Sequence, residues 1–212
     1  MVSVLPRFYP ILDTLALTRR GRQPVLFSEA LLEAGVRLLQ FRHKGHFSRQ
    51  MFETAQTVAG LCAQAGAQLI INDRADLAAL LHVGLHLGQD DLPPALALRI
   101  LGPGAPLGFS THNAAQLAAA HHEPASYLAI GPVFSTFSKD NPDPQVGLEQ
   151  IPHLRTLTTK PLVAIGGITR ETAQSVLRAG ADSIAVIGDI IPDEITRASV
   201  RARAAEWLDA TR

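Results

Sequence analysis

The chain has 212 residues, 47% hydrophobic and 18% charged, so it can bury a sizeable core as one large domain or two small ones. Lysine plus arginine and aspartate plus glutamate number 19 each, which argues against a general attraction to nucleic acid or to an anionic membrane. The single cysteine, Cys62, excludes an internal disulfide and fits a reducing compartment.

The N-terminal stretch MVSVLPRFYPIL lacks the basic start and long apolar core of a secretory signal. Nowhere does an apolar run reach the roughly 18 residues that a membrane-spanning helix requires. The sequence therefore predicts a cytoplasmic protein with no membrane partner.

Short apolar runs recur along the chain and are typical of buried parallel strands. The eight runs cover residues 7–12, 37–42, 68–73, 84–89, 106–111, 127–133, 161–167 and 183–189. Amphipathic segments between the runs predict helices, among them residues 48–66, 113–122, 169–180 and 193–210. Three expected helix ends carry a glycine just ahead of a strand, namely Gly35, Gly66 and Gly180.

Strand and helix alternate eight times in about 200 residues, which predicts a (β/α)8 TIM barrel. No linker, low-complexity tract or charge run divides the chain, so we expect residues 1–212 to form one barrel domain. A doubly wound open sheet is the alternative fold.

Polar residues follow the predicted strands where each apolar run stops. In a barrel these C-terminal strand ends share one mouth, so Asp73 and Asp91 are expected to face a common site. Gln40, Arg42 and Lys44 alternate within QFRHK, and a period of two directs all three to one side of the strand. Carboxylates and cations at one mouth favour Mg²⁺ that bridges to an anionic substrate.

Each of these features also has a simpler interpretation. An aspartate at a strand-to-helix junction is frequently a helix N-cap, and this holds for Asp73 and Asp91 taken singly. The pair Gly166 and Gly167 could form only a tight turn. In TIM barrels, however, backbone N–H groups after strands 7 and 8 commonly bind phosphate, and Gly188 follows the next strand. Residues 134–150 are rich in hydroxyl groups, proline and aspartate and are typical of a binding loop.

Six motifs, in this order, resemble the thiamine-phosphate synthase family over residues 8–190. They are QFRHK, INDRADLA, GLHLGQDDLP, GFSTHN, IGPVFSTFSK with GLEQI, and AIGGIT with AGADSIAVI. The resemblance implies a (β/α)8 transferase that joins 4-amino-2-methyl-5-(diphosphooxymethyl)pyrimidine to a thiazole phosphate. Thiamine phosphate and pyrophosphate are the implied products, Mg²⁺ the implied cofactor, and a homo-oligomer is left open.

The resemblance also implies roles for single residues. Asp73 and Asp91 would hold Mg²⁺. Arg42, Lys44, Lys139 and Ser110 would assist departure of the diphosphate as catalytic residues. The pyrimidine diphosphate would be bound by Gln40, Arg42, Lys44, Asn72, Ser110 and Lys139. The thiazole phosphate would be bound by Thr136, Phe137, Ser138, Gly167, Ile187 and Gly188.

The chain departs from the family pattern in a few places. Phe41 and His43 stand in a motif that usually reads LREK, Ser138 replaces a usual threonine, and Gly188 often corresponds to serine. Two alternatives to the synthase stay open. A thiazole tautomerase paralogue would carry a general-base histidine where this chain has Pro132, and a non-catalytic barrel could bind the same phosphate ligands.

Overall fold

The strands of the computed structural model, which describes residues 5–136 and 143–212, close into a parallel barrel. In the described residues eight strands follow one another around the ring in chain order, and β8 returns to pair with β1. They are β1 (Phe8–Asp13), β2 (Leu38–Arg42), β3 (Gln68–Asn72), β4 (Gly84–Leu87), β5 (Leu107–Thr111), β6 (Tyr127–Ile130), β7 (Leu162–Ile165) and β8 (Ser183–Val186). The expected (β/α)8 barrel is confirmed, and the open doubly wound sheet is wrong.

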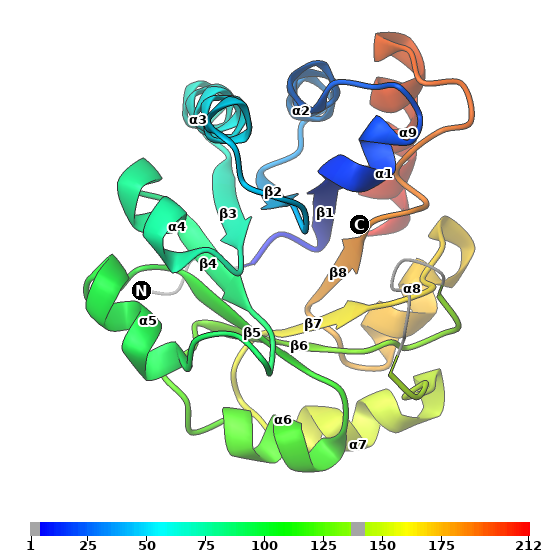
Figure 1. Cartoon of the computed structure of the whole chain (residues 1–212). Helices are drawn as coiled ribbons and strands as arrows, with labels where there is room; N and C mark the ends of the chain where they lie inside the picture. Colours follow the sequence, from blue (N-terminus) through cyan, green and yellow to red (C-terminus); the bar gives the residue numbers. More distant parts are fainter. Residues whose placement is uncertain (1–4, 137–142) are drawn as a thin grey trace.

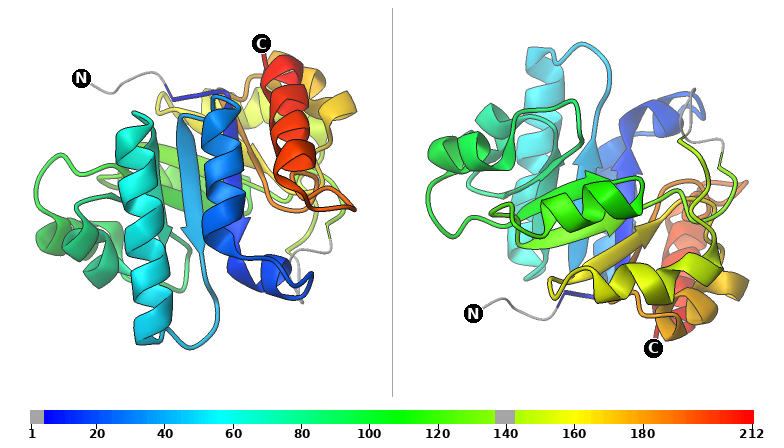
Figure 2. Two further views of the ribbon diagram at one scale, coloured as in Figure 1. Left: turned by 90° about the horizontal axis from the view of Figure 1, so that it is seen from above. Right: turned by 90° about the horizontal axis from the view of Figure 1, so that it is seen from below.

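Helices surround the ring of strands (Figure 1), and Figure 2 shows α2, α3 and α9 side by side along one flank. The helices are α1 (Thr14–Thr18), α2 (Pro24–Glu33), α3 (Arg49–Gln64), α4 (Ala75–Leu81), α5 (Pro94–Leu101), α6 (Ala114–Ala120), α7 (Ile151–Thr156), α8 (Arg170–Arg178) and α9 (Arg197–Ala210), with a short 3-10 helix, η1 (Leu148–Gln150). None of the helices in the described ranges is long and apolar enough to cross a bilayer.

Local sequence explains where several helices begin and end. The Ser48 side chain accepts a hydrogen bond from the Met51 N–H and caps α3. Gly35, Gly66 and Gly180 adopt φ of 105°, 64° and 120° after their helices, a backbone region that favours glycine. The three glycine stops expected from the sequence are therefore confirmed.

The apolar side chains form two layers because successive strand residues point to opposite faces. One set fills the barrel lumen: Tyr9, Ile11, Leu38, Ile70, Tyr127, Ala129, Val163 and Ala185. The larger set lies between the barrel and the helices and includes Trp207, whose ring stacks on Phe8 at a centroid distance of 5.5 Å. Polar lumen-facing residues are therefore placed at the strand ends, where the filled interior meets the mouth.

Candidate active site

Strand β2 directs its alternating polar residues toward the lumen and the mouth, as the period of two predicts. Gln40 is 2% exposed and donates to the Tyr9 hydroxyl at 2.9 Å, so it lies inside the barrel. Arg42 forms an ion pair with Asp13 at the end of β1. Lys44 lies further out, with its Nζ atom 2.5 Å from Asp73 Oδ2. The three residues thus lie at increasing distance from the lumen, and only Lys44 contacts a predicted metal ligand in the described ranges.

Asp13 is a residue that sequence reasoning did not select. Its Oδ1 atom accepts from the Ala16 N–H and caps α1, while its Oδ2 atom accepts from Arg42. A carboxylate with both oxygens used in this way holds the planar guanidinium in one orientation. Asp13 therefore orients Arg42 at the mouth. The sequence feature that could have identified Asp13 is its position as an acid directly after the first apolar run, residues 7–12.

The two predicted metal ligands lie together, as the barrel geometry requires. Asp73 adopts a left-handed φ of 64°, and its N–H donates to the carbonyl of His86 at 2.8 Å. Asp91 lies close enough to Asp73 for the two carboxylates to interact electrostatically, and its Oδ2 atom accepts from the Gly88 N–H at 2.7 Å. Aspartate tolerates the left-handed region better than most residues, and the Asp73 carboxylate contacts Lys44.

The N-cap interpretation of these two aspartates is wrong. The N-cap residues of α4 and α5 are Arg74 and Pro93, and neither helix has a side-chain capping bond. Asp91 instead bonds within its own loop, and Asp73 pairs with Lys44. Both carboxylates are therefore directed to the mouth and are not used at a helix end.

Asp73 and Asp91 interact electrostatically. Burial raises the pKa of Asp91, the Asp73 carboxylate raises it further, and the Gly88 N–H opposes the shift. Two carboxylates that compete for one proton are stabilised by an added cation. Among the described residues no cluster of three or more His, Cys, Asp or Glu could hold a metal. Mg²⁺ commonly takes only one or two protein carboxylates and completes its shell with water and phosphate, so Asp73 and Asp91 could hold it without a third protein ligand.

Asn72 carries an unsatisfied polar atom beside the carboxylates. It ends β3, is 9% exposed, and its Nδ2 atom is the one buried side-chain nitrogen or oxygen without a hydrogen-bond partner in the described residues. A buried donor without a partner costs about 1–3 kcal/mol. An acceptor on a bound ligand would remove that cost, which fits the substrate-binding role expected for Asn72.

His86 lies between the mouth of the barrel and its lumen. Its Nε2 atom lies 2.8 Å from Ser110 Oγ, and its Nδ1 atom lies 3.0 Å from the Tyr127 hydroxyl. Burial lowers the pKa of His86 to about 4. The imidazole is therefore neutral near pH 7, with one nitrogen donating and the other accepting.

The low pKa of His86 predicts a pH-dependent stability. The unfolded chain binds this proton near pH 6.5, whereas the folded protein binds it only near pH 4, so stability is lost as pH falls between these values. Relative to a His86→Gln variant, we expect the free energy of unfolding to decrease by up to about 3 kcal/mol over that range. Urea unfolding of both proteins at several pH values measures the difference. A difference independent of pH would contradict a buried, neutral imidazole.

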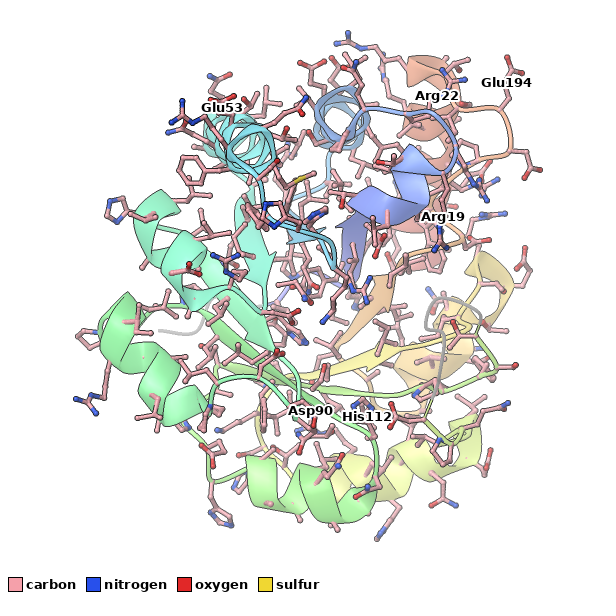
Figure 3. All side chains as sticks on the ribbon, viewed as in Figure 1. Arg19, Arg22, Glu53, Asp90, His112 and Glu194 are labelled. Carbon is pink, nitrogen blue, oxygen red and sulfur yellow. The ribbon has the colours of Figure 1, made fainter. Side chains whose placement is uncertain are left out.

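A cavity of about 420 Å³ opens beside Ser110 at the ends of β5 to β8. Five of the predicted substrate-binding residues line it: Ser110, Thr136, Gly167, Ile187 and Gly188. His112 also lines it and lies with Nδ1 2.8 Å from the Gly131 carbonyl oxygen, a contact not foreseen from the sequence. Figure 3 labels His112 in the loop after β5 and Asp90 in the loop after β4. Ser110 lines the cavity and contacts His86, whose carbonyl oxygen accepts from the Asp73 N–H, so the cavity and Asp73 are linked through these two residues.

The glycine pair after β7 permits a close approach of two loops. A Cβ atom on Gly166 would lie 2.5 Å from Pro132 Cα, and one on Gly167 would lie 2.3 Å from the Ser135 carbonyl oxygen. Their φ angles are 102° and 64°, so both the turn and the phosphate-site interpretations agree with the backbone. In the described part of the chain the N–H groups of Gly167 and Gly188 donate to no protein group, and both residues line the cavity.

Gln89 is a further residue that sequence reasoning did not select. Its Nε2 atom donates to the Ser110 carbonyl oxygen at 2.6 Å and ties the β4 loop to β5. The HLGQDD motif contained it, but nothing local indicated its partner. Phe137, Ser138 and Lys139 lie outside the described residues, so their predicted roles stay predictions.

Comparison with known proteins identifies the family of the chain. The thiamine monophosphate synthase profile matches residues 8–190, which is most of the chain. The chain belongs to the thiamine monophosphate synthase family. Thiamine-phosphate synthase of Koribacter versatilis is 48% identical over 202 residues, covering 92% of this chain and 93% of the relative. The Chloroflexus aurantiacus thiamine-phosphate synthase is 40% identical, covering 93% and 91%.

A solved structure supports the same assignment. Thiamine phosphate pyrophosphorylase from Pyrococcus furiosus superposes with a TM-score of 0.83 at 29% identity, covering 97% of this chain and 95% of that one. The resemblance to the thiamine monophosphate synthase family is thus confirmed, and with it the expected enzyme class, a transferase of thiamine biosynthesis.

Proposed function

We propose that the protein condenses 4-amino-2-methyl-5-(diphosphooxymethyl)pyrimidine with a thiazole phosphate to give thiamine phosphate and pyrophosphate. The observation that carries this proposal is that Ser110 and His86 link two unlike half-sites. On one side lie Lys44, Asp73 and Asp91, which suit a metal-bound diphosphate. On the other side lies a cavity of about 420 Å³ that suits a small phosphorylated ring.

The reaction breaks one bond and forms another at the same carbon. The C–O bond between the pyrimidine methylene and the diphosphate breaks, and the electron pair leaves with the diphosphate. The thiazole nitrogen then donates its electron pair to the methylene carbon and forms a C–N bond. No side chain needs to act as a nucleophile, so the protein contributes charge, orientation and proximity.

The diphosphate half-site is built from residues of β2 to β5. Asp73 and Asp91 would hold Mg²⁺, which when bound supplies positive charge to the leaving group. Lys44, which also contacts Asp73, and Arg42, oriented by Asp13, would hold the diphosphate oxygens. The unsatisfied Asn72 Nδ2 atom supports a contact to the same substrate. Lys139 is expected to join this group from the connection after β6.

The thiazole half-site is built from residues after β6, β7 and β8. The N–H groups of Gly167 and Gly188 would bind the phosphate, with Thr136, Phe137, Ser138 and Ile187 beside it. Gly188 has no side chain where relatives often carry serine, so its contribution would come from the backbone alone. Preorganised N–H groups of this kind bind an anion without the cost of reorienting a flexible side chain.

The domain organisation, cellular location and partners of the protein are part of the same proposal. We take residues 1–212 as a single barrel domain that works on small molecules in the cytoplasm, without nucleic acid or membrane partners. Every residue named in the proposed site belongs to one chain. The site would therefore be complete in each subunit of a homo-oligomer.

The decisive experiment mixes the purified protein with both substrates and Mg²⁺ and measures thiamine phosphate and pyrophosphate. We expect the two products in equal amounts, and we expect EDTA to abolish their formation. Isomerisation of a thiazole carboxylate phosphate without condensation would favour the tautomerase. Ligand binding without any product would favour a non-catalytic barrel.

A further inference from the structure

Five polar side chains form a continuous series of hydrogen bonds through the barrel lumen. Gln40 Nε2 lies 2.9 Å from the Tyr9 hydroxyl, which lies 2.8 Å from the Tyr127 hydroxyl. The Tyr127 hydroxyl is 3.0 Å from His86 Nδ1, and His86 Nε2 is 2.8 Å from Ser110 Oγ. The series begins on β2, crosses β1, β6 and β4, and ends on β5 at the mouth.

The series passes through apolar surroundings. Tyr9 and Tyr127, which are 1% and 2% exposed, belong to the same lumen cluster as Leu38, Ile70 and Val163. In such an environment a polar group without a partner is costly, and bonded groups polarise one another. Both tyrosines of the chain are used in this series.

The backbone leaves room for the central contact. A Cβ atom on Gly108 would lie 2.1 Å from Tyr127 Cζ and 2.4 Å from His86 Nδ1. Any larger residue at this lumen-facing position of β5 would separate the two rings, which stack at a centroid distance of 5.6 Å. The contact between Tyr127 and His86 therefore requires glycine at position 108.

The Gln40 donor at one end favours one direction for the series. Gln40 donates to the Tyr9 oxygen, so the single Tyr9 proton is available for Tyr127. In this direction the Tyr127 proton would be donated to His86 Nδ1. A neutral imidazole that accepts at Nδ1 carries its proton on Nε2 and donates it to Ser110. An imidazole that accepts at Nδ1 must be neutral, because the protonated ring donates from both nitrogens.

We propose that Gln40, Tyr9, Tyr127 and His86 form a polarised hydrogen-bond wire that makes the Ser110 oxygen an acceptor inside the barrel and turns its proton toward the mouth. This inference rests on the proposed function, in which Ser110 contacts the leaving diphosphate. The reverse direction would present the lone pairs of Ser110 to that anion and repel it. His86, Tyr127 and Tyr9 are positioning residues, because they act through Ser110.

The tautomer of His86 tests the wire without any assay of activity. Protein with ¹⁵N-labelled histidine is examined at pH 7 by long-range ¹H–¹⁵N correlation, and a His86→Gln variant identifies the resonance. We expect one neutral tautomer with the proton on Nε2. A proton on Nδ1, or a mixture of both tautomers, would overturn the proposed direction.

Kinetics test the consequence for Ser110. Tyr127→Phe keeps the ring but removes the hydroxyl, and we expect kcat to fall about tenfold while KM for the pyrimidine diphosphate stays within about twofold. Tyr9→Phe interrupts the wire one bond further away and should lower kcat in the same direction. An unchanged kcat in both variants, or a change in KM alone, would contradict positioning of Ser110.

Ser183→Ala is the matched control. It removes a buried hydroxyl of β8 that donates to the Pro6 carbonyl oxygen at 2.7 Å and does not belong to the wire. We expect its kcat to equal that of the parent. A lower kcat in Ser183→Ala would show that loss of any buried hydroxyl reduces activity. If the parent protein makes no thiamine phosphate, the proposed function fails, while the His86 tautomer still decides whether the wire exists.

Discussion

An Asp91→Asn variant is expected to lose activity without losing stability. The neutral amide cannot supply the charge that a divalent cation needs, so kcat/KM should decrease by about 100- to 1,000-fold. The amide oxygen can still accept from the Gly88 N–H, which preserves the local turn. Because burial and Asp73 raise the pKa of Asp91, the ionised carboxylate destabilises the fold at neutral pH. In EDTA the variant should therefore unfold at the same temperature as the parent or at a higher one.

Asp90→Asn provides the matched control for this change. Asp90 is the neighbouring residue in the same loop, carries the same charge and is exposed (Figure 3). We expect its activity to stay within about twofold of the parent, as is usual for surface substitutions away from a site. Equal losses in both variants would indicate a general effect of charge near the mouth. Full activity of the Asp91 variant would remove the metal role from this residue.

The second large effect is expected from Gly167→Ala. The new Cβ atom would meet the Ser135 carbonyl oxygen at 2.3 Å, and the left-handed φ of 64° costs about 1–2 kcal/mol for a residue with a side chain. The loop after β6 and residue 167 must therefore move apart. The N–H group of residue 167, which would bind the phosphate, is displaced as a result. We expect a loss of stability of at least that size and a KM for the thiazole phosphate raised about tenfold or more. Denaturant unfolding and steady-state kinetics measure the two effects.

Two other glycines serve as controls for Gly167→Ala. A Cβ atom on Gly188 would meet nothing within 4 Å, so Gly188→Ala should leave the stability unchanged. Gly60→Ala lies in the middle of α3 with similarly open space, and it should add about 0.5–1 kcal/mol of stability with unaltered activity. A Gly167 variant with normal stability and normal KM would show that the close approach of the loops is not required.

The barrel could be predicted from the sequence because its signals are local. Each apolar run is a few residues long, most of the runs end in a polar residue, and each helix stop at Gly35, Gly66 and Gly180 needs only its own backbone. The convergence of Asp73 and Asp91 followed from the fold alone, since the ends of parallel strands share one mouth. The period of two in QFRHK predicted that Lys44 lies on the same side as Gln40 and Arg42, and the structure places it beside Asp73.

The wrong or missing predictions concern partners that are distant in the chain. The N-cap interpretation of Asp73 and Asp91 was reasonable from local preference, but the left-handed backbone of Asp73 and the Gly88 contact of Asp91 exclude it. Asp13 was overlooked because its partner Arg42 lies 29 residues further along. Gln89 was overlooked because its acceptor belongs to the next strand.

The sequence by itself determined the order of strands and helices, the filled lumen and the presence of acids and cations at the strand ends, because burial and backbone geometry depend on short stretches of chain. Tertiary structure alone decided which polar groups bond to one another. Tyr9 and Tyr127 are 118 residues apart and meet because the barrel closes, so that β1 and β6 face the same lumen. Hydrogen bonds act over about 3 Å, and only the closed ring brings such distant residues within that range.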